Sequence, residues 1–234
     1  SNLRSSMDFA MQTIIPQAIK ETESWDKGFA KLYDGLANDF HYASPKDLMI
    51  FPDNHDMDRI FTQMEENVEN TKMALATYLV LPRIPQLYYG TEILMQNTAK
   101  PGDHGLIRTD FPGGWKGDTK NAFTGKGLSA KERDMQHYLK TLLTWRKTSA
   151  VIHKGKLQHF SPANGFYVYF RYLDNRAVMV VLNKNEQEGS LDLNPYQHFL
   201  AGKKTARNVI TGKQVTLGSA LVLPAKTSVV IELQ

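Results

Sequence analysis

The first two thirds of the chain show hydrophobic spacings typical of helices that alternate with buried strands. Apolar residues from Met7 to about Ala37 recur with helical spacing and predict one or two helices. A continuous apolar run at 48–51 predicts a strand that is buried on both faces of a parallel sheet. A mostly buried helix at 67–81 and a second strand at 85–89 follow. This order predicts two parallel strands joined by a crossover.

The pattern changes in the last third of the chain. Lys100–Lys126 is rich in Gly, Asp and Thr and predicts a long surface loop, and a capping box at Ser129–Glu132 predicts a helix that runs to about Lys147. From Leu157 onward, short alternating strands separated by turn residues predict an antiparallel β-sandwich. We therefore expect two domains, residues 1–150 and residues 151–234.

Composition narrows the possible classes of protein. The formal charge of +4 is modest and the basic residues are spread along the chain, so we expect no nucleic-acid partner. No apolar run reaches the roughly 18 residues that a membrane span needs, so we expect a soluble chain without a membrane partner. The absence of cysteine excludes disulfides, thiolate metal sites and thiol nucleophiles. The histidines from His137 onward are isolated, and we expect no metal and no cofactor.

Candidate chemistry follows the first predicted strand. Pro52 ends that strand, and the polar cluster Asn54, His55 and Asp56 comes directly after it. In a βα protein, the segment just past a parallel strand faces the active-site end of the sheet. A polar turn that caps the following helix is the alternative interpretation, because Asn and Asp are favoured caps.

Several segments resemble the α-amylase family of glycoside hydrolases, in its neopullulanase and cyclomaltodextrinase-like members. The segment FPDNHD at 51–56 resembles the family's region at the seventh barrel strand, and IPQLYYGTE at 84–92 resembles its eighth-strand signature. Residues 102–115 and Met7–Phe9 are similar to further segments of such members. The order and spacing agree with the family over nearly the whole chain. Arg83 departs from the pattern, because a glycine usually precedes the Ile-Pro pair.

The resemblance implies a fold that combines an α/β part with an all-β part. A closed (β/α)₈ TIM barrel needs about 250 residues, whereas only some 150 precede the predicted sandwich. We therefore expect a partial barrel, made of about its last two to three βα units, followed by the antiparallel β-sandwich. Nothing in the chain resembles the family's fourth-strand segment with the nucleophilic aspartate or its fifth-strand segment with the acid/base glutamate. The chain, which begins Ser1-Asn2, is expected to be a C-terminal fragment.

The resemblance also implies roles for individual residues. Asp56 is expected to be the third catalytic carboxylate, which stabilises the transition state, with His55 and Asn54 beside it at the substrate. A carboxylate acceptor next to an imidazole donor can hold adjacent sugar hydroxyls as an oxocarbenium-like transition state forms. Arg59 is a candidate for orienting nearby carboxylates, and a structural role is its alternative.

Three further residues are candidates for binding substrate. Glu92 either contacts substrate or bonds to loop amides at a strand end. Trp115 and Phe111 either stack on sugar faces or anchor the long loop. The polar residues Asp103, His104, Arg108 and Asp110 of that loop form either a cation or sugar-hydroxyl site or, as the plainer interpretation, internal salt bridges that hold the loop.

The expected function is therefore that of one part of a retaining α-glycoside hydrolase. It would act on starch-like α-glucans such as maltooligosaccharides, cyclodextrins and pullulan, and the fragment alone would be inactive, because retaining enzymes need two carboxyl groups. The alternatives are a non-catalytic carbohydrate-binding or assembly module, and an enzyme in which Asp56 and Glu92 form a complete pair. The expected partners are an α-glucan oligosaccharide and either the missing N-terminal barrel half or a second copy, recruited by an unpaired edge at 48–51. The cellular compartment stays open.

Overall fold

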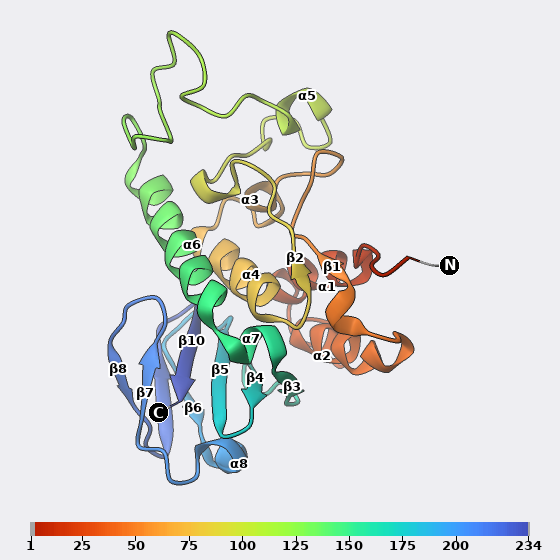
Figure 1. Ribbon diagram of the computed structural model, residues 1–234, viewed down its shortest axis with the longest axis vertical. Coiled ribbons are helices and arrows are strands. Elements are labelled where there is room, and N and C mark those ends of the chain that lie inside the picture. The colour runs from red at the N-terminus through yellow and green to blue at the C-terminus, as the bar shows by residue number, and fades with distance from the viewer. Residues whose placement is uncertain (1–2, 234) are drawn as a thin grey trace.

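The computed structural model describes residues 3–233 and contains a helical region, residues 7–154, and a β region, residues 156–233 (Figure 1). The helical region holds short 3₁₀ turns and nine named elements, in chain order α1 (Phe9–Lys20), α2 (Phe29–Ala37), β1 (Met49–Ile50), α3 (Ile60–Gln63), α4 (Val68–Val80), β2 (Ile84–Pro85), α5 (His104–Ile107), α6 (Ala130–Thr148) and α7 (Ala150–Lys154). The predicted alternation of helices and strands is confirmed.

The two strands of the helical region are parallel, as the sequence predicts. Met49 pairs with Ile84 and Ile50 pairs with Pro85, with α3 and α4 between the strands in the chain. The second strand is shorter than its predicted range of 85–89. Its last ladder bond runs from the Gln86 amide to the Ile50 carbonyl, and Pro52 then ends the partner strand.

The predicted absence of a neighbour before β1 is wrong at Met49. Met7 forms a parallel bridge with Met49, the Asp8 amide donates to the Met49 carbonyl, and the Met49 amide donates to the Ser6 carbonyl. The residues just before α1 therefore act as the end of a further strand. The open edge lies instead at β2, which has no strand on its other side within residues 3–233.

Arg83, which stands where the family usually has a glycine, is buried and forms ion pairs that connect these segments. Its Nε donates to the Asp8 carboxylate at 2.8 Å, and its Nη2 pairs with Asp39. The same Asp8 side chain caps α1 through the Met11 amide. Replacing a glycine by arginine therefore links the start of α1 to the start of β2.

The β region is built around one antiparallel sheet. Its strands are β3 (Lys156–His159), β4 (Phe166–Leu173), β5 (Arg176–Asn183), β6 (Gly189–Asp192), β7 (Thr205–Asn208), β8 (Gln214–Thr216), β9 (Ala220–Leu223) and β10 (Thr227–Leu233). Six of them form a sheet in the order β3-β4-β5-β10-β7-β8, and β6 pairs with β9. The short helix α8 (Gln197–Leu200) lies between β6 and β7 in the chain. The second layer of the predicted sandwich is thus the β6–β9 pair with α8.

Alternation along the strands places two hydrophobic cores on the two faces of this sheet. Phe170 and Met179 pack in a core with residues of β6, β9 and α8. Tyr167, Tyr169 and Val180 face the other way and join one continuous core with α1, α2, α4 and α6. Because both faces are buried, the sheet holds the helical region on one side and its own second layer on the other.

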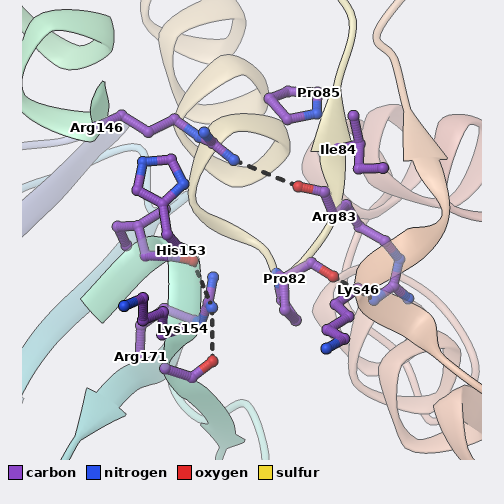
Figure 2. A pocket seen from close by; sticks show the side chains of 11 residues that line it. Lys46, Pro82, Arg83, Ile84, Pro85, Arg146, His153, Lys154 and Arg171 are labelled. Carbon is purple, nitrogen blue, oxygen red and sulfur yellow. Dashed lines mark hydrogen bonds between the residues drawn. The ribbon is translucent and has the colours of Figure 1, made fainter. Parts of the chain in front are cut away.

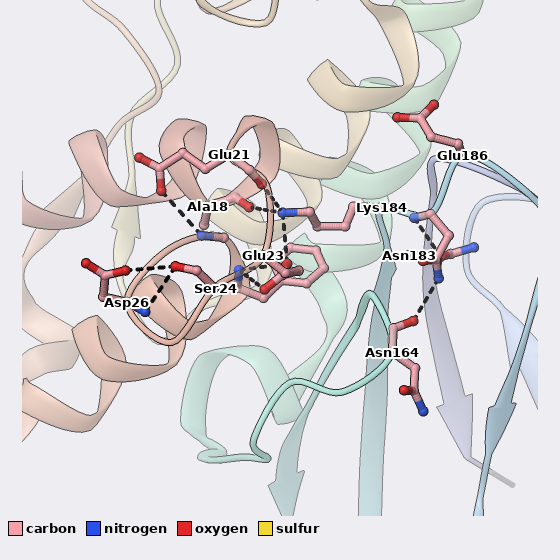
Figure 3. Close-up of polar contacts among 12 residues, drawn as sticks. Ala18, Glu21, Glu23, Ser24, Asp26, Asn164, Asn183, Lys184 and Glu186 are labelled. Atoms are coloured by element: carbon pink, nitrogen blue, oxygen red, sulfur yellow. Dashed lines mark hydrogen bonds and ion pairs between the residues drawn. The ribbon is translucent and has the colours of Figure 1, made fainter.

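Polar contacts also tie the two regions together. Figure 3 shows Lys184, just after β5, whose ammonium donates to the carbonyls of Ala18 and Glu21 and pairs with Glu23 at 2.8 Å. Arg171 on β4 donates to the Val80 carbonyl at the end of α4. The loop after β1, drawn in orange, lies on the side of the helical region away from the six-stranded sheet (Figure 1).

Candidate active site

The turn after β1 is shaped by a buried carboxyl group. Asp53 is fully buried, and it accepts hydrogen bonds from the Ile60 amide at 2.7 Å and from the Thr91 hydroxyl at 3.4 Å. Burial raises the pKa of Asp53 to about 6. Asp53 thus accepts the hydrogen bond from the first amide of α3. The polar residues that follow Asp53 are not needed for this bond.

Asn54 shapes the backbone of the predicted cluster. Its side chain is buried, and its Oδ1 accepts a hydrogen bond from the Asp56 amide at 2.8 Å, the geometry of an Asx turn. The alternative in which the cluster caps α3 therefore does not hold for Asn54. Asn54 instead turns the chain so that His55 and Asp56 project from it.

Four exposed residues meet at this turn, and we call them the Asp56 cluster: His55, Asp56, His104 and Arg108. Arg108 Nη2 donates to Asp56 Oδ1 at 3.0 Å, and Arg108 Nε donates to the His55 carbonyl at 2.9 Å. His55 Nε2 lies 3.3 Å from Asp56 Oδ2. Figure 1 shows α5, which carries His104, beside the loop after β1. The long loop therefore closes onto the predicted catalytic residue.

The hydrogen bonds of the cluster fix which groups remain available. His104 Nδ1 lies 2.8 Å from Arg108 Nη2, and because a guanidinium has no acceptor, this nitrogen must accept. In the neutral ring the proton then sits on Nε2, where it is free to donate. The side chains of His55 and Asp56 are 62% and 60% exposed. The cluster thus presents a carboxylate acceptor beside imidazole donors at an open surface.

Exposure also argues against a structural role for the cluster. Ion pairs between exposed groups contribute about 0–1 kcal/mol to stability. The Arg108–Asp56 pair is such a pair, with side chains that are both about half exposed or more. Fold stability therefore does not explain why these groups gather at the carboxyl end of β1. Their position is the one from which a βα protein presents its chemistry.

Arg59 occupies a different place from the one predicted for it. It is fully buried and donates to the carbonyls of Ile107 and Tyr89, and its guanidinium lies 4.1 Å from the ring centre of Tyr88. It makes no ion pair with Asp56. In this structure the long loop and the aromatic pair cover Arg59. Arg59 instead anchors that loop from beneath.

Among the described residues, none of the other three candidates makes a hydrogen bond, ion pair or ring contact with the Asp56 cluster. Glu92 lies half-buried in the 3₁₀ turn Thr91–Ile93 and, among residues 3–233, makes no hydrogen bond or ion pair. Phe111 packs against the small core that contains Ile93 and meets the Phe123 ring edge-on, so it anchors the loop. Trp115 is 67% exposed. Figure 1 shows the light-green segment after α5 extending away from the loop that holds Asp56.

Two residues of the cluster, His104 and Arg108, belong to the loop for which the sequence favours internal salt bridges over a cation or sugar-hydroxyl site. One such salt bridge exists between Lys100 and Asp103 at 2.7 Å. Arg108, however, reaches across to Asp56. The usable signal is the spacing of His104 and Arg108, four residues apart, which places both on one side of a helical turn. Residues 3–233 contain no cluster of three metal-ligating side chains and no helix long and apolar enough to cross a membrane.

The fold and the site together define a barrel-type α/β protein with an appended antiparallel β region. Residues 1–161 match the family described as the alpha amylase catalytic domain. Residues 157–232 match the cyclo-malto-dextrinase C-terminal domain. Because the first match covers more than half of the chain, the chain belongs to the α-amylase family, which acts on α-glucans.

Individual relatives agree with this assignment. Alpha-amylase 3 of Dictyoglomus thermophilum is 26% identical over 235 residues, which is 79% of this chain and 46% of that protein. A cyclomaltodextrin glucanotransferase of Thermoanaerobacterium thermosulfurigenes is 26% identical over 77% of this chain and 22% of its own. The crystal structure of the Geobacillus thermoleovorans alpha-amylase complexed with acarbose superposes with a TM-score of 0.77 at 22% identity, over 99% of this chain and 48% of that one. The chain therefore spans about half of that structure and less than half of both curated relatives.

Proposed function

We propose that this chain forms the last part of the catalytic barrel, and the β domain after it, of a retaining α-glycoside hydrolase. Residues 1–150 would be the barrel portion and residues 151–234 the β domain. Its substrates would be starch-like α-glucans such as maltooligosaccharides, cyclodextrins and pullulan. The observation that carries this proposal is the Asp56 cluster at the carboxyl end of β1, in a chain of the α-amylase family.

The chemistry of the cluster supports a role in the transition state. As a glycosidic bond breaks, positive charge develops on the sugar ring and the ring flattens. Asp56 can accept a hydrogen bond from a sugar hydroxyl while the imidazole groups of His55 and His104 donate to its neighbours. Bonds that strengthen as the ring flattens lower the barrier more than they tighten substrate binding.

The same cluster is insufficient for a retaining mechanism. Such enzymes place a nucleophilic carboxylate and an acid/base carboxyl group roughly 5–5.5 Å apart across the bond. Asp56 is the one carboxylate of the cluster, and both of its oxygens already face cationic or imidazole groups. In our proposal Asp56 therefore assists, and the nucleophile and the acid/base residue are supplied by earlier barrel strands. In a closed barrel the first strand would adjoin the open edge of β2.

The decisive experiment extends the chain upstream. The coding sequence before Ser1 is expected to encode an aspartate at the end of a fourth barrel strand and a glutamate at the end of a fifth. In that longer protein, Asp56→Asn is expected to lower kcat on maltooligosaccharides by about 10²–10³-fold or more while changing KM little. Asp174→Asn, at an exposed turn of the β region, is the matched control and is expected to retain full activity. Unchanged kcat in the Asp56 variant would refute the assigned role.

A second candidate function rests on Trp115. Its indole is 67% exposed on the long loop, and an exposed aromatic ring offers a sugar a flat apolar face. A non-catalytic carbohydrate-binding module would use this surface without the Asp56 cluster. Glucan binding by the purified chain that survives Asp56→Ala but disappears in Trp115→Ala would favour the module over the enzyme part.

A further inference from the structure

A cavity lies at the opposite end of β1 and β2 from the Asp56 cluster (Figure 2). It has a volume of about 450 Å³, and it lies where the helical region meets the β region. Its charged and polar lining comes from the segments before both strands, from the ends of α6 and α7, and from β4; these side chains are Lys46, Arg83, Arg146, His153, Lys154 and Arg171. Figure 2 shows Arg146 and His153 on one side of the cavity and Lys46 on the other.

The lining is strongly one-sided in charge. Five of the residues that line the cavity are Lys or Arg, and none is Asp or Glu. Arg83 is compensated, because its guanidinium is directed at Asp8 and Asp39. Within residues 3–233, the other four cations form no ion pair with a carboxylate. The cavity therefore holds a local excess of positive charge.

The hydrogen bonds of the two arginines leave this charge unneutralised. Arg171 is buried and donates only to backbone carbonyls, among them those of Ile152 and Gly155 at 2.9 and 2.8 Å. Arg146 donates Nε to the Leu79 carbonyl at 2.8 Å and Nη2 to the Arg83 carbonyl at 3.3 Å. Arg146 Nη1 makes no hydrogen bond to any residue that the structure describes. Carbonyl dipoles satisfy the donors, but they do not cancel the net charge.

The uncompensated positive charges in the cavity repel each other, and a bound anion would reduce this repulsion. Burial, with Arg146 and Arg83 nearby, lowers the pKa of Arg171 to about 10, and burial also lowers the pKa of Arg146. Both changes show that the charged forms are disfavoured here. An anion in the cavity would offset the mutual repulsion and would pair with the free donors. The two ammonium groups, Lys46 and Lys154, make no hydrogen bond to other described residues and are free to turn toward it.

We propose that this cavity is a binding site for a phosphate group, either free or carried on a small molecule. Arg146, Lys46 and Lys154 would hold the phosphate oxygens. Guanidinium and ammonium donors that several elements bring to one cavity suit a tetrahedral, multiply charged oxyanion. The volume falls within the range of about 300–1,000 Å³ typical of small-molecule sites, which leaves room for a sugar or similar group beyond the phosphate. This site is independent of the proposed hydrolase activity, because it lies at the other end of the strands.

The test measures anion binding by the purified chain with inorganic phosphate, glucose 6-phosphate and malonate, each against sodium chloride of equal ionic strength. Isothermal titration and the midpoint of thermal unfolding are the readouts. We expect phosphate to bind and to raise the midpoint, and malonate, a dicarboxylate, to bind more weakly. Tighter binding of glucose 6-phosphate than of phosphate would assign the site to a phosphorylated molecule, and the reverse would assign it to the free ion. Equal affinity for phosphate and malonate would overturn the phosphate assignment.

Paired variants locate the binding. Lys46→Gln combined with Lys154→Gln removes two exposed cations that make no structural hydrogen bond, so the variant is expected to fold. It should weaken phosphate binding at least about tenfold, because each charge-assisted bond contributes substantially to affinity. Lys116→Gln combined with Lys126→Gln removes the same charge from the long loop and should keep the affinity within about twofold of the unmodified chain. Equal weakening in both double variants, or no binding beyond that of chloride, would refute the site.

Discussion

The two sheets of this molecule differ in how completely their strands are paired and covered. In the six-stranded sheet, β5 pairs with β4 along eight residues and with β10 along six, and both faces are buried. In the other sheet, β1 and β2 pair along two residues, and β2 has an open edge among the residues that the structure describes. The strands of the six-stranded sheet are therefore long and covered on both faces, whereas the two strands of the helical region are short and, among the described residues, β2 is unpaired on one side.

The hydrophobic cores and the candidate chemistry lie in different places in this molecule. The large buried side chains of the β region form two cores, and none of the four residues of the Asp56 cluster belongs to a core. The cluster stands at the end of the incomplete sheet, where exposed polar groups can meet a substrate. The β sheet thus joins the helical region through one shared core, and the Asp56 cluster lies outside both cores.

Removing a large buried side chain from the six-stranded sheet should have the largest effect on the free energy of unfolding. Phe170 is fully buried and its ring stacks on Phe199 with ring centres 4.2 Å apart. Phe170→Ala is expected to lower the free energy of unfolding by about 3–5 kcal/mol. Ile84→Ala, at the half-exposed edge strand β2, should cost less than about 1.5 kcal/mol. Urea unfolding of both variants measures the difference. Similar losses of unfolding free energy would show that the two sheets do not differ in this way.

The next effect concerns the buried polar groups of the two regions. Asp53 in the barrel part and Asn183 in the β region are both fully buried, but only Asp53 titrates. Because burial raises the pKa of Asp53 from 3.8 to about 6, the folded chain holds this proton more tightly than the unfolded chain does. The stabilising contribution of the protonated group is thus complete below pH 3.8 and is lost as the pH rises through about 6.

The variant Asp53→Asn removes that titration. Between pH 4 and 7, the free energy of unfolding of the unmodified chain should fall relative to the variant by up to about 3 kcal/mol. Chemical denaturation at a series of pH values provides the measurement, with Asp174→Asn as the control for an exposed carboxyl group. A difference between the unmodified chain and the Asp53 variant that stays constant with pH would show that Asp53 is not held in this way.

The smallest expected difference is in amide exchange. Amides of Val180 and Val181, at the centre of the six-stranded sheet, should exchange at least about a hundredfold more slowly than those of Ile84 and Gln86, which bond across the two-residue sheet. Hydrogen exchange followed by NMR resolves the four amides. Protection of Ile84 and Gln86 as strong as that of β5 would mean that the β2 edge is already covered, for example by a second copy of the chain.

Much of the strand and helix arrangement was predictable from the hydrophobic periodicity of the sequence. The alternation of Phe166, Val168 and Phe170 against Tyr167 and Tyr169 gives the two faces of β4 correctly, because side chains of a strand alternate strictly. The continuous apolar run at 48–51 likewise marks a strand with parallel partners. Local caps were also accessible, since both hydrogen bonds of the Ser129–Glu132 capping box are present.

Features that depend on contacts between distant segments were not predictable in this way. The apolar pattern continues to Ile210, but strand β7 ends at Asn208, whose side chain accepts hydrogen bonds from the amides of Ile210 and Thr211 and turns the chain. The bond from Arg108 to Asp56 joins residues 52 positions apart. Arg59 follows the same rule, since its burial depends on the later loop and on Tyr89. Sequence propensity describes single segments, whereas these contacts depend on how distant segments pack against each other.

The most direct test of the central claim is an assay of the purified chain of residues 1–234 on maltooligosaccharides, cyclodextrin and pullulan. The account predicts no hydrolysis above the buffer rate, with or without Asp56→Ala, because the nucleophile and the acid/base residue would come from other strands. Hydrolysis by the unmodified chain that disappears in Asp56→Ala would contradict it, and would show that the Asp56 cluster is a complete catalytic centre.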